Sequence, residues 1–182
     1  EVIGDDAQSE LPGNSVVFTA RATNLGNRED NASIDFTELG GGWSSSVSPT
    51  EFDLDYLGVQ DVLITVTIAE DAYEGDIRYV DVTVTSVGDD AVSEVISTST
   101  STLQFADLDN EAPGAGYEEP DRTVEFDFII TNHGNGHDSF TIEAESEHGW
   151  NLTLSDSETG TLDRNQAQTV TVEVEIPYGT TA

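Results

Sequence analysis

The sequence predicts an all-β protein made of two tandem antiparallel β-sandwiches, the second of them incomplete. Apolar and polar residues alternate along most of the chain, as in "VDVTVTSV" at residues 80–87, and no segment shows convincing helical periodicity. Turn-forming Gly, Asn and Asp separate the alternating segments, and all five prolines fall at expected loops or strand ends. A domain-sized stretch of sequence also occurs twice, which predicts two copies of one building block.

Strands are expected at short intervals along both copies. In the first copy, alternation predicts strands near residues 15–23, 32–38, 43–48, 51–56, 61–69, 77–87 and 91–105. In the second copy, it predicts strands near residues 122–131, 138–145, 149–155, 159–163 and 167–176. We expect the Ser/Thr alternation at residues 97–102 to close the first sandwich and to continue into the second. About seven short strands in each unit are typical of an immunoglobulin-like sandwich.

The internal repeat has a period of about a hundred residues. The pattern Thr-Asn-x-Gly-Asn-x-x-Asp occurs at residues 23–30 and again at residues 131–138, an offset of 132 − 24 = 108. The Gly-Trp pairs that end at Trp43 and Trp150 match after a one-residue deletion. Such a period indicates a domain-sized unit and not a short solenoid repeat.

The repeat predicts a first sandwich at residues 1–105 and a second at residues 106–182. The second lacks its last two strands, because the first copy continues past Ile68 with two more strands and the second stops soon after the matching Ile176. Two explanations stay open. The missing strands belong to a longer polypeptide of which this is a segment, or another subunit supplies a strand by β-augmentation, as in donor-strand assemblies.

The repeat also decides how the histidine-rich stretch "ITNHGNGHDSF" at residues 130–140 is interpreted. His133 and His137 stand opposite Leu25 and Glu29, so the first copy builds the same segment without them, and we expect no metal site there. Both copies keep turn formers: Gly for positive φ, and Asn and Asp for bonds to their own backbone. The predicted structural turn residues are Asn24, Gly26, Asn27, Asp30, Asn132, Gly134, Asn135 and Asp138.

The net charge is strongly negative, with 37 acidic residues, 5 arginines and a formal charge of −32. Such a surface repels nucleic acid and anionic lipid headgroups, so neither is expected as a direct partner. The acids are interleaved with Val, Ile, Phe and Tyr, which favours a folded protein with an acidic surface over disorder. A saline setting and a merely acidic extracellular protein both fit. With no cysteine and no apolar run of membrane length, we expect neither disulfides nor a membrane span.

One candidate metal site lies between the two copies. The stretch "DLDNEAPG" contains Asp107, Asp109, Asn110 and Glu111, and alternate acidic side chains with loop carbonyls suit calcium. Calcium is the one cofactor that the sequence suggests. The alternative is a solvated acidic loop.

Two sequons make Asn31 and Asn151 candidate glycosylation sites. We expect Asn31 to be exposed just after a turn, and the residue that follows Asn151, Leu152, to point inward. The two tryptophans recur at one structural position, so a core role is expected for both; the alternative is an exposed pair that stacks on sugars. No set of catalytic residues is recognisable, and we expect no enzyme activity.

The repeated motif resembles NEW3-like and related CARDB-type immunoglobulin-like domains, which occur in tandem in archaeal and bacterial surface and secreted proteins. The residues 23–30 and 131–138, the two Gly-Trp pairs and the Ile-Pro-Tyr-Gly stretch at 176–179 carry this resemblance. The first copy departs from the pattern at Ala69, where proline is usual. The resemblance implies an extracellular or cell-surface spacer, lattice or accessory role, and a haloarchaeal surface-layer protein would match the charge.

The sequence therefore predicts a non-enzymatic spacer or self-assembly unit of an extracellular surface layer or filament. Its partners would be further copies, neighbouring domains of a longer chain, or glycans. Two other functions stay open: a carbohydrate-binding or accessory module of a secreted hydrolase, and an adhesin or filament subunit completed by donor-strand exchange.

Salt should stabilise the folded chain, because like charges destabilise a compact state and at about 1 M salt the Debye length falls to about 3 Å. We expect the Tm, measured by circular dichroism, to rise between dilute buffer and about 1 M NaCl. Sucrose serves as an uncharged control, since it acts by exclusion and not by screening. A Tm that is unchanged or lower in NaCl would contradict this prediction.

Overall fold

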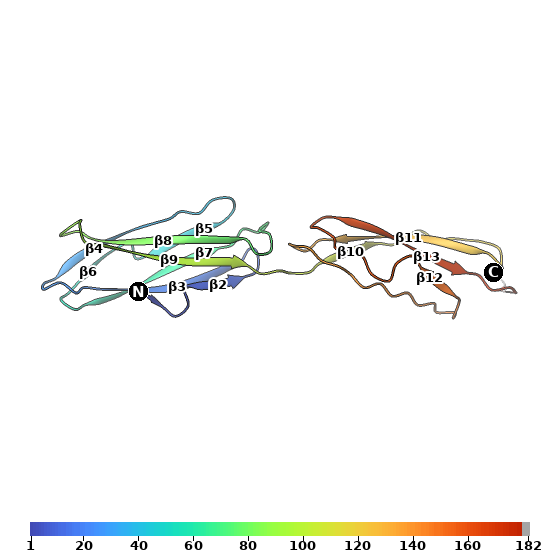
Figure 1. Cartoon of the computed structure of the whole chain (residues 1–182), viewed down its shortest axis with the longest axis horizontal. Helices are drawn as coiled ribbons and strands as arrows, with labels where there is room; N and C mark the ends of the chain where they lie inside the picture. Colours follow the sequence, from blue (N-terminus) through green and yellow to red (C-terminus); the bar gives the residue numbers. More distant parts are fainter. Residues whose placement is uncertain (180–182) are drawn as a thin grey trace. The chain divides into compact units, whose positions relative to one another are not determined.

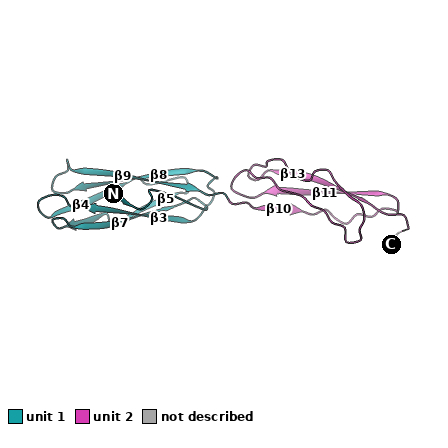
Figure 2. Ribbon diagram, turned by 60° about the horizontal axis from the view of Figure 1, so that its bottom comes forward, with its two compact units in different colours: residues 1–104 teal, residues 105–182 magenta. Residues whose placement is uncertain are grey.

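A computed structural model describes residues 1–179, and within this range the chain is all-β with no helix (Figure 1). The predicted fold class is confirmed. The chain divides into two compact units, Glu1–Gln104 and Phe105–Ala182, close to the predicted boundary (Figure 2). Over the described residues, no helix has the length and apolarity needed to cross a membrane.

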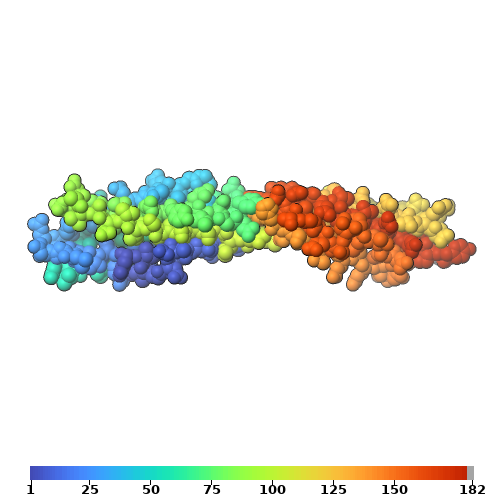
Figure 3. Space-filling view, viewed as in Figure 1, coloured from blue at the N-terminus to red at the C-terminus, as the bar shows by residue number. Residues whose placement is uncertain are grey.

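The first unit is a sandwich of two sheets. One sheet has the order β1 (Val2–Ile3), β3 (Ser15–Thr23), β7 (Val59–Thr67), β5 (Ser44–Ser48). The other has the order β2 (Ala7–Glu10), β9 (Ser93–Thr102), β8 (Ile77–Ser86), β4 (Asp30–Phe36), β6 (Glu51–Leu54). Neighbouring strands are antiparallel, except that β2 runs parallel to β9. In the space-filling view, the blue N-terminal residues lie against the green strands accordingly (Figure 3).

Alternating apolar side chains of the two sheets form the core of the first unit. Because successive side chains point to opposite faces of a strand, every second residue of β3, β7 and β8 turns inward. Trp43 is only 4% exposed within this core, so the core role predicted for it is confirmed. The Arg78 guanidinium lies 5.4 Å from the centre of its ring, at cation–π distance. The most deeply buried apolar residues of the two sheets are Phe18, Val62, Ile64, Val66, Val80 and Val82.

The second unit contains one sheet within the described residues. Its order is β10 (Leu108–Glu111), β11 (Thr123–Asn132), β13 (Ala167–Glu175), β12 (Leu152–Leu154), with all neighbours antiparallel. At the repeat offset of 108, β11 and β13 match β3 and β7 of the first unit. This sheet is therefore the counterpart of the sheet β1-β3-β7-β5, and the described chain contains no counterpart of the opposing sheet.

Two predicted strands of the second copy, 138–145 and 159–163, are wrong. The structure has only isolated bridges there, from Asp138 to Leu162 and from Thr141 to Glu158. In the first unit, the matching β4 is held between β6 and β8. Within residues 1–179, no strand lies beside 138–145 in the way that β8 lies beside β4. Alternation alone does not make a strand when no neighbour accepts its backbone hydrogen bonds.

The predicted strand at 91–105 is too long. β9 ends at Thr102, and residues 103–107 form no strand, so the chain does not continue from one unit to the next in a single strand. The short strands β1, β2 and β10 were not predicted. Each has four residues or fewer, which is too short for alternation to be read, and each forms by pairing with a longer strand.

Candidate functional site

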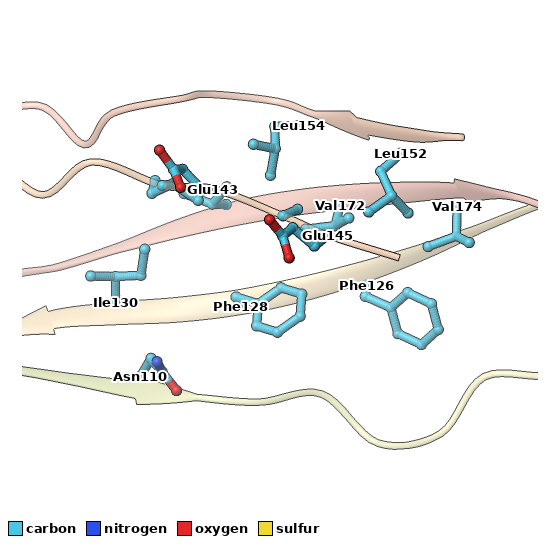
Figure 4. Close-up of a pocket in the computed structure, with 13 residues that line it drawn as sticks. Asn110, Phe126, Phe128, Ile130, Glu143, Glu145, Leu152, Leu154, Val172 and Val174 are labelled. Atoms are coloured by element: carbon cyan, nitrogen blue, oxygen red, sulfur yellow. The ribbon is translucent and has the colours of Figure 1, made fainter. Parts of the chain in front are cut away.

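The inner face of the second unit's sheet forms an open apolar groove. Alternation along β11 places Phe126, Phe128 and Ile130 at this face, and the two rings lie next to each other in Figure 4. The groove has a volume of about 400 Å³. Its other lining residues are the apolar Ile142, Ala144, Leu152, Leu154, Val170, Val172 and Val174 and the polar Asn110, Glu143 and Glu145.

Several groove residues are less buried than their counterparts in the first unit. Phe126 and Val174 are only half-buried, whereas the matching Phe18 and Val66 are each 1% exposed. The first unit buries these positions between two sheets, while the second unit covers them with one sheet and the irregular segment 138–145. A sheet that is apolar on one face normally buries that face against another layer, so this face is suited to receive one.

In each copy, the side chain of the first Asn in the turn motif holds the turn together by hydrogen bonds. The Asn24 side chain donates to the Arg28 and Leu54 carbonyls at 2.8 and 3.0 Å and accepts the Gly26 N–H at 2.9 Å. Asn132 donates to the Gly136 and Leu162 carbonyls at 2.9 and 2.8 Å and accepts the Gly134 N–H at 2.9 Å. The two patterns match at the repeat offset, so the same side chain closes the turn in both copies.

The turn glycines act differently from the prediction. Gly26 and Gly134 do not have the positive φ that we expected. Instead, a Cβ on either would lie 3.0 Å from the preceding Asn Oδ1, and a Cβ on Gly134 would also lie 2.6 Å from the Phe105 carbonyl oxygen. These glycines are required by close approach and not by backbone conformation.

The second Asn of the motif is buried in the second copy and exposed in the first. Asn135 is 2% exposed and its Oδ1 accepts the Phe105 N–H at 2.8 Å, so it ties the turn to the segment before β10. Asn27 is exposed.

In the first unit, the Asp of the motif begins β4 and bonds to the end of the neighbouring strand β8 in the same sheet. Asp30 accepts the Asn31 N–H at 2.8 Å, the Ser86 hydroxyl at 2.5 Å and the Gly88 N–H at 3.3 Å. These hydrogen bonds, led by that of Ser86, lower the pKa of Asp30 below its ordinary value. Asp138 makes the equivalent local bond, accepting the Ser139 N–H at 2.8 Å.

The histidines take no part in a metal cluster. His133 and His137 are both exposed, the first donating its backbone N–H to Asp107 and the second pairing with the Asp163 carboxylate. Within residues 1–179, no group of three or more His, Cys, Asp or Glu side chains is placed to hold a metal.

The four residues proposed for calcium do not converge in the structure. Leu108–Glu111 is strand β10, in which Asn110 turns into the groove and Asp109 and Glu111 turn to the opposite face. Calcium needs six to eight oxygen ligands around one point. Calcium binding at this segment stays a prediction. In the described chain, the four residues do not converge to form a set of ligands.

Asn31 and Asn151 are both exposed, as a glycosylation site requires. Leu152 turns into the groove, as predicted. Trp150 is half-buried, unlike Trp43, and lies with Arg122, Asn151 and Glu175 around a shallow polar pocket of about 390 Å³. The two tryptophans therefore do not form an exposed pair.

Comparison with known proteins gives no family. No protein-family profile and no curated sequence matches the chain. A protein of unknown function from Porphyromonas gingivalis aligns at 13% identity over 91% of this chain and 77% of its own, with a TM-score of 0.38. The secreted serine protease VesC from Vibrio cholerae aligns at 13% identity over 96% of this chain and 45% of its own, with a TM-score of 0.38.

The Class 5 fimbriae chaperone CfaA aligns at 10% identity over 97% of this chain and 100% of its own, with a TM-score of 0.36. With TM-scores below 0.5, none of these likenesses carries an argument about this chain. Its function has to be argued from its own residues.

Replacing Asn132 by Ala should destabilise the second unit by about 2–3 kcal/mol, because the buried Leu162 and Gly136 carbonyls and the Gly134 N–H lose their partner. The neighbouring His133→Ala, at an exposed side chain, should change stability by less than about 0.5 kcal/mol. Urea unfolding followed by Trp150 fluorescence in a Trp43→Phe background measures both. Equal effects of the two substitutions would contradict the role given to Asn132.

The Asp30 carboxyl should titrate below its ordinary pKa of 3.8, and Ser86→Ala should move its pKa back toward that value by removing the main hydrogen bond. Because the folded pKa is depressed, the stability that this group contributes is present above pH 3.8 and is lost as the pH falls through the folded pKa. Carbon-detected NMR of the carboxyl measures the titration. Thr85→Ala on the same strand is the control. An Asp30 pKa that is unchanged by Ser86→Ala would contradict the assignment.

Proposed function

We propose that this chain is a non-enzymatic structural segment of an extracellular tandem immunoglobulin-like protein and acts as a self-assembly unit of a surface layer or filament. The observation that carries the proposal is the open apolar groove on the second unit. A half-covered sheet face of this kind offers apolar sites for alternate side chains of an incoming strand, and unpaired backbone beside it offers hydrogen bonds.

The groove favours completion by incoming strands over contact between two finished surfaces. Its floor is a regular sheet, but the segment at 138–145 makes only isolated bridges and so retains backbone groups that another strand can pair with. Assembly by strand donation, as in a filament subunit, is therefore the form of assembly that best fits the second unit.

The acidic surface supports the same proposal in a different way. With a formal charge of −32, two copies repel each other at long range in dilute buffer. Association therefore has to come from apolar burial and backbone pairing, the interactions that the groove supplies, and it strengthens as salt or cations screen the charge. A carbohydrate-binding role has less support, because Trp43 is buried and only Trp150 lies at a pocket.

Sedimentation velocity of the full chain at about 1 M NaCl, where charge repulsion is screened, tests the proposal. We expect association that increases with concentration and is lost in Phe128→Asp, which places a charge in the groove. Val17→Asp is the matched control, because Val17 is 50% exposed on the outer face of the first unit. A chain that stays monomeric at all concentrations, or that associates equally well in both variants, would overturn self-assembly through the groove.

A further inference from the structure

We propose that the outer face of strands β8 and β9 in the first unit binds a neutral polysaccharide, with Tyr79 as the ring on which a sugar stacks. The site consists of two adjacent rows of side chains, one apolar and one of hydroxyls. It lies outside the groove and contains neither tryptophan, so it is independent of the proposed self-assembly. Its residues, which form the Tyr79 strip, are Ile77, Tyr79 and Asp81 of β8 and Ser97, Ser99 and Ser101 of β9.

The Ser/Thr alternation at residues 97–102 places a row of hydroxyls on this outer face. The three threonines of this stretch turn inward and are at most 4% exposed. Because successive side chains of a strand point to opposite faces, the three serines turn outward. A serine hydroxyl both donates and accepts hydrogen bonds, and its side chain is short. The row therefore offers hydrogen bonds to a ligand without covering the neighbouring strand.

The ring of Tyr79 is open to solvent because its neighbours across the sheet are small. Ser99 of β9 lies opposite Tyr79, and Ala7 of β2 lies opposite Ser99. Tyr79 is 62% exposed, and Ile77, two residues earlier on the same face, is 46% exposed. An aromatic residue within a sheet usually packs against large cross-strand neighbours. Here the ring has none on β9, so its face is available for a ligand.

The polar groups beside the ring match the edge of a sugar. The Ser97 hydroxyl donates to the Asp81 carboxylate, and the Ser9 and Ser101 hydroxyls lie 2.6 Å apart. A carboxylate has about four lone-pair sites, so Asp81 accepts further hydroxyls in addition to that of Ser97. A pyranose ring has C–H groups on its face, which suit the electron-rich face of Tyr79, and hydroxyls at its edge, which suit the serine row.

The charge of this face decides the class of polysaccharide. Among the outward residues of 7–9, 77–83 and 95–101, all of which the structure describes, Asp81 is the only charged one. The outer face of the second unit's sheet differs, because its β11 and β13 strands present Glu125, Asp127, Glu173 and Glu175. A chain with a formal charge of −32 repels an anionic polysaccharide, so the ligand that suits this face is neutral.

The width of the apolar row favours a single polymer chain over a protein partner. A stable protein interface buries about 800 Å² on each partner and has a large apolar centre. Ile77 and Tyr79 instead form a row one strand wide, which is about 5 Å, with serines beside it. An extended polysaccharide lying along β8 contacts this row and the hydroxyls of β9 together.

Depletion of the full chain from solution by insoluble neutral polysaccharides tests the site. Cellulose, chitin, curdlan and cross-linked dextran are each mixed with the chain at about 1 M NaCl, where repulsion between bound copies is screened, and the unbound protein is measured by absorbance. We expect saturable binding to at least one of them, with competition by soluble oligosaccharides of the same sugar. Absence of binding to all four would overturn the proposal.

Tyr79→Ala should raise the Kd about tenfold, because it removes the stacking ring, whereas Tyr79→Phe keeps the ring and should change the Kd less than about twofold. Ser99→Leu, which covers the side of the ring, should weaken binding as Tyr79→Ala does. Tyr56→Ala is the matched control, because Tyr56 is 60% exposed in the same unit but lies outside the strip. Equal losses in Tyr79→Ala and Tyr56→Ala would overturn the assignment.

Phe128→Asp separates this site from the groove. The variant should bind the polysaccharide as the unchanged chain does, even where its self-association is lost, because Phe128 lines the groove of the second unit. Loss of binding in Phe128→Asp with full binding in Tyr79→Ala would place the polysaccharide in the groove and overturn the proposal. Circular dichroism of each variant checks that lost binding is not lost folding.

Discussion

A β-sheet with one apolar face is stable only when another layer covers that face, and this constraint governs both units. In the first unit, the sheets β1-β3-β7-β5 and β2-β9-β8-β4-β6 cover each other, and their alternating residues form a closed core. In the second unit, the same first sheet is present with the same alternation, but the described chain provides no opposing sheet. Its apolar face lines the groove, and the proposed self-assembly depends on that difference.

Some hydrogen bonds of the turn motif form whether or not a second sheet covers the first. The side chains of Asn24 and Asn132 bond to backbone groups within their own turn and one neighbouring turn, so the same hydrogen bonds form in both units. The Asp of the motif has a longer reach. In the first unit, Asp30 bonds to Ser86 at the end of β8, whereas Asp138 in the second unit accepts the N–H of the adjacent Ser139.

Charge and apolar surface have separate roles in this protein. Carboxylates cover the outside, where they repel one another in dilute buffer and are screened in salt. The few arginines act locally, as in the paired hydrogen bonds of Arg21 to Asp61 at 2.7 and 2.9 Å. In the proposed self-assembly, specific association falls to the groove, where burial and strand pairing do not depend on opposite charges.

The sequence by itself determined the all-β class, the repeat, the long strands and the structural character of the Asn-Gly-Asn-Asp turn. Two-residue alternation and turn chemistry are local properties, so β3, β7, β11 and β13 lie within two residues of their predicted bounds. Only the tertiary structure decided that 138–145 is not a strand, that Trp150 is half-buried where Trp43 is buried, and that Gly134 is needed for a close approach. Each of these depends on which segment lies alongside in space, because a strand needs a partner for its hydrogen bonds and an apolar side chain needs a second layer to bury it.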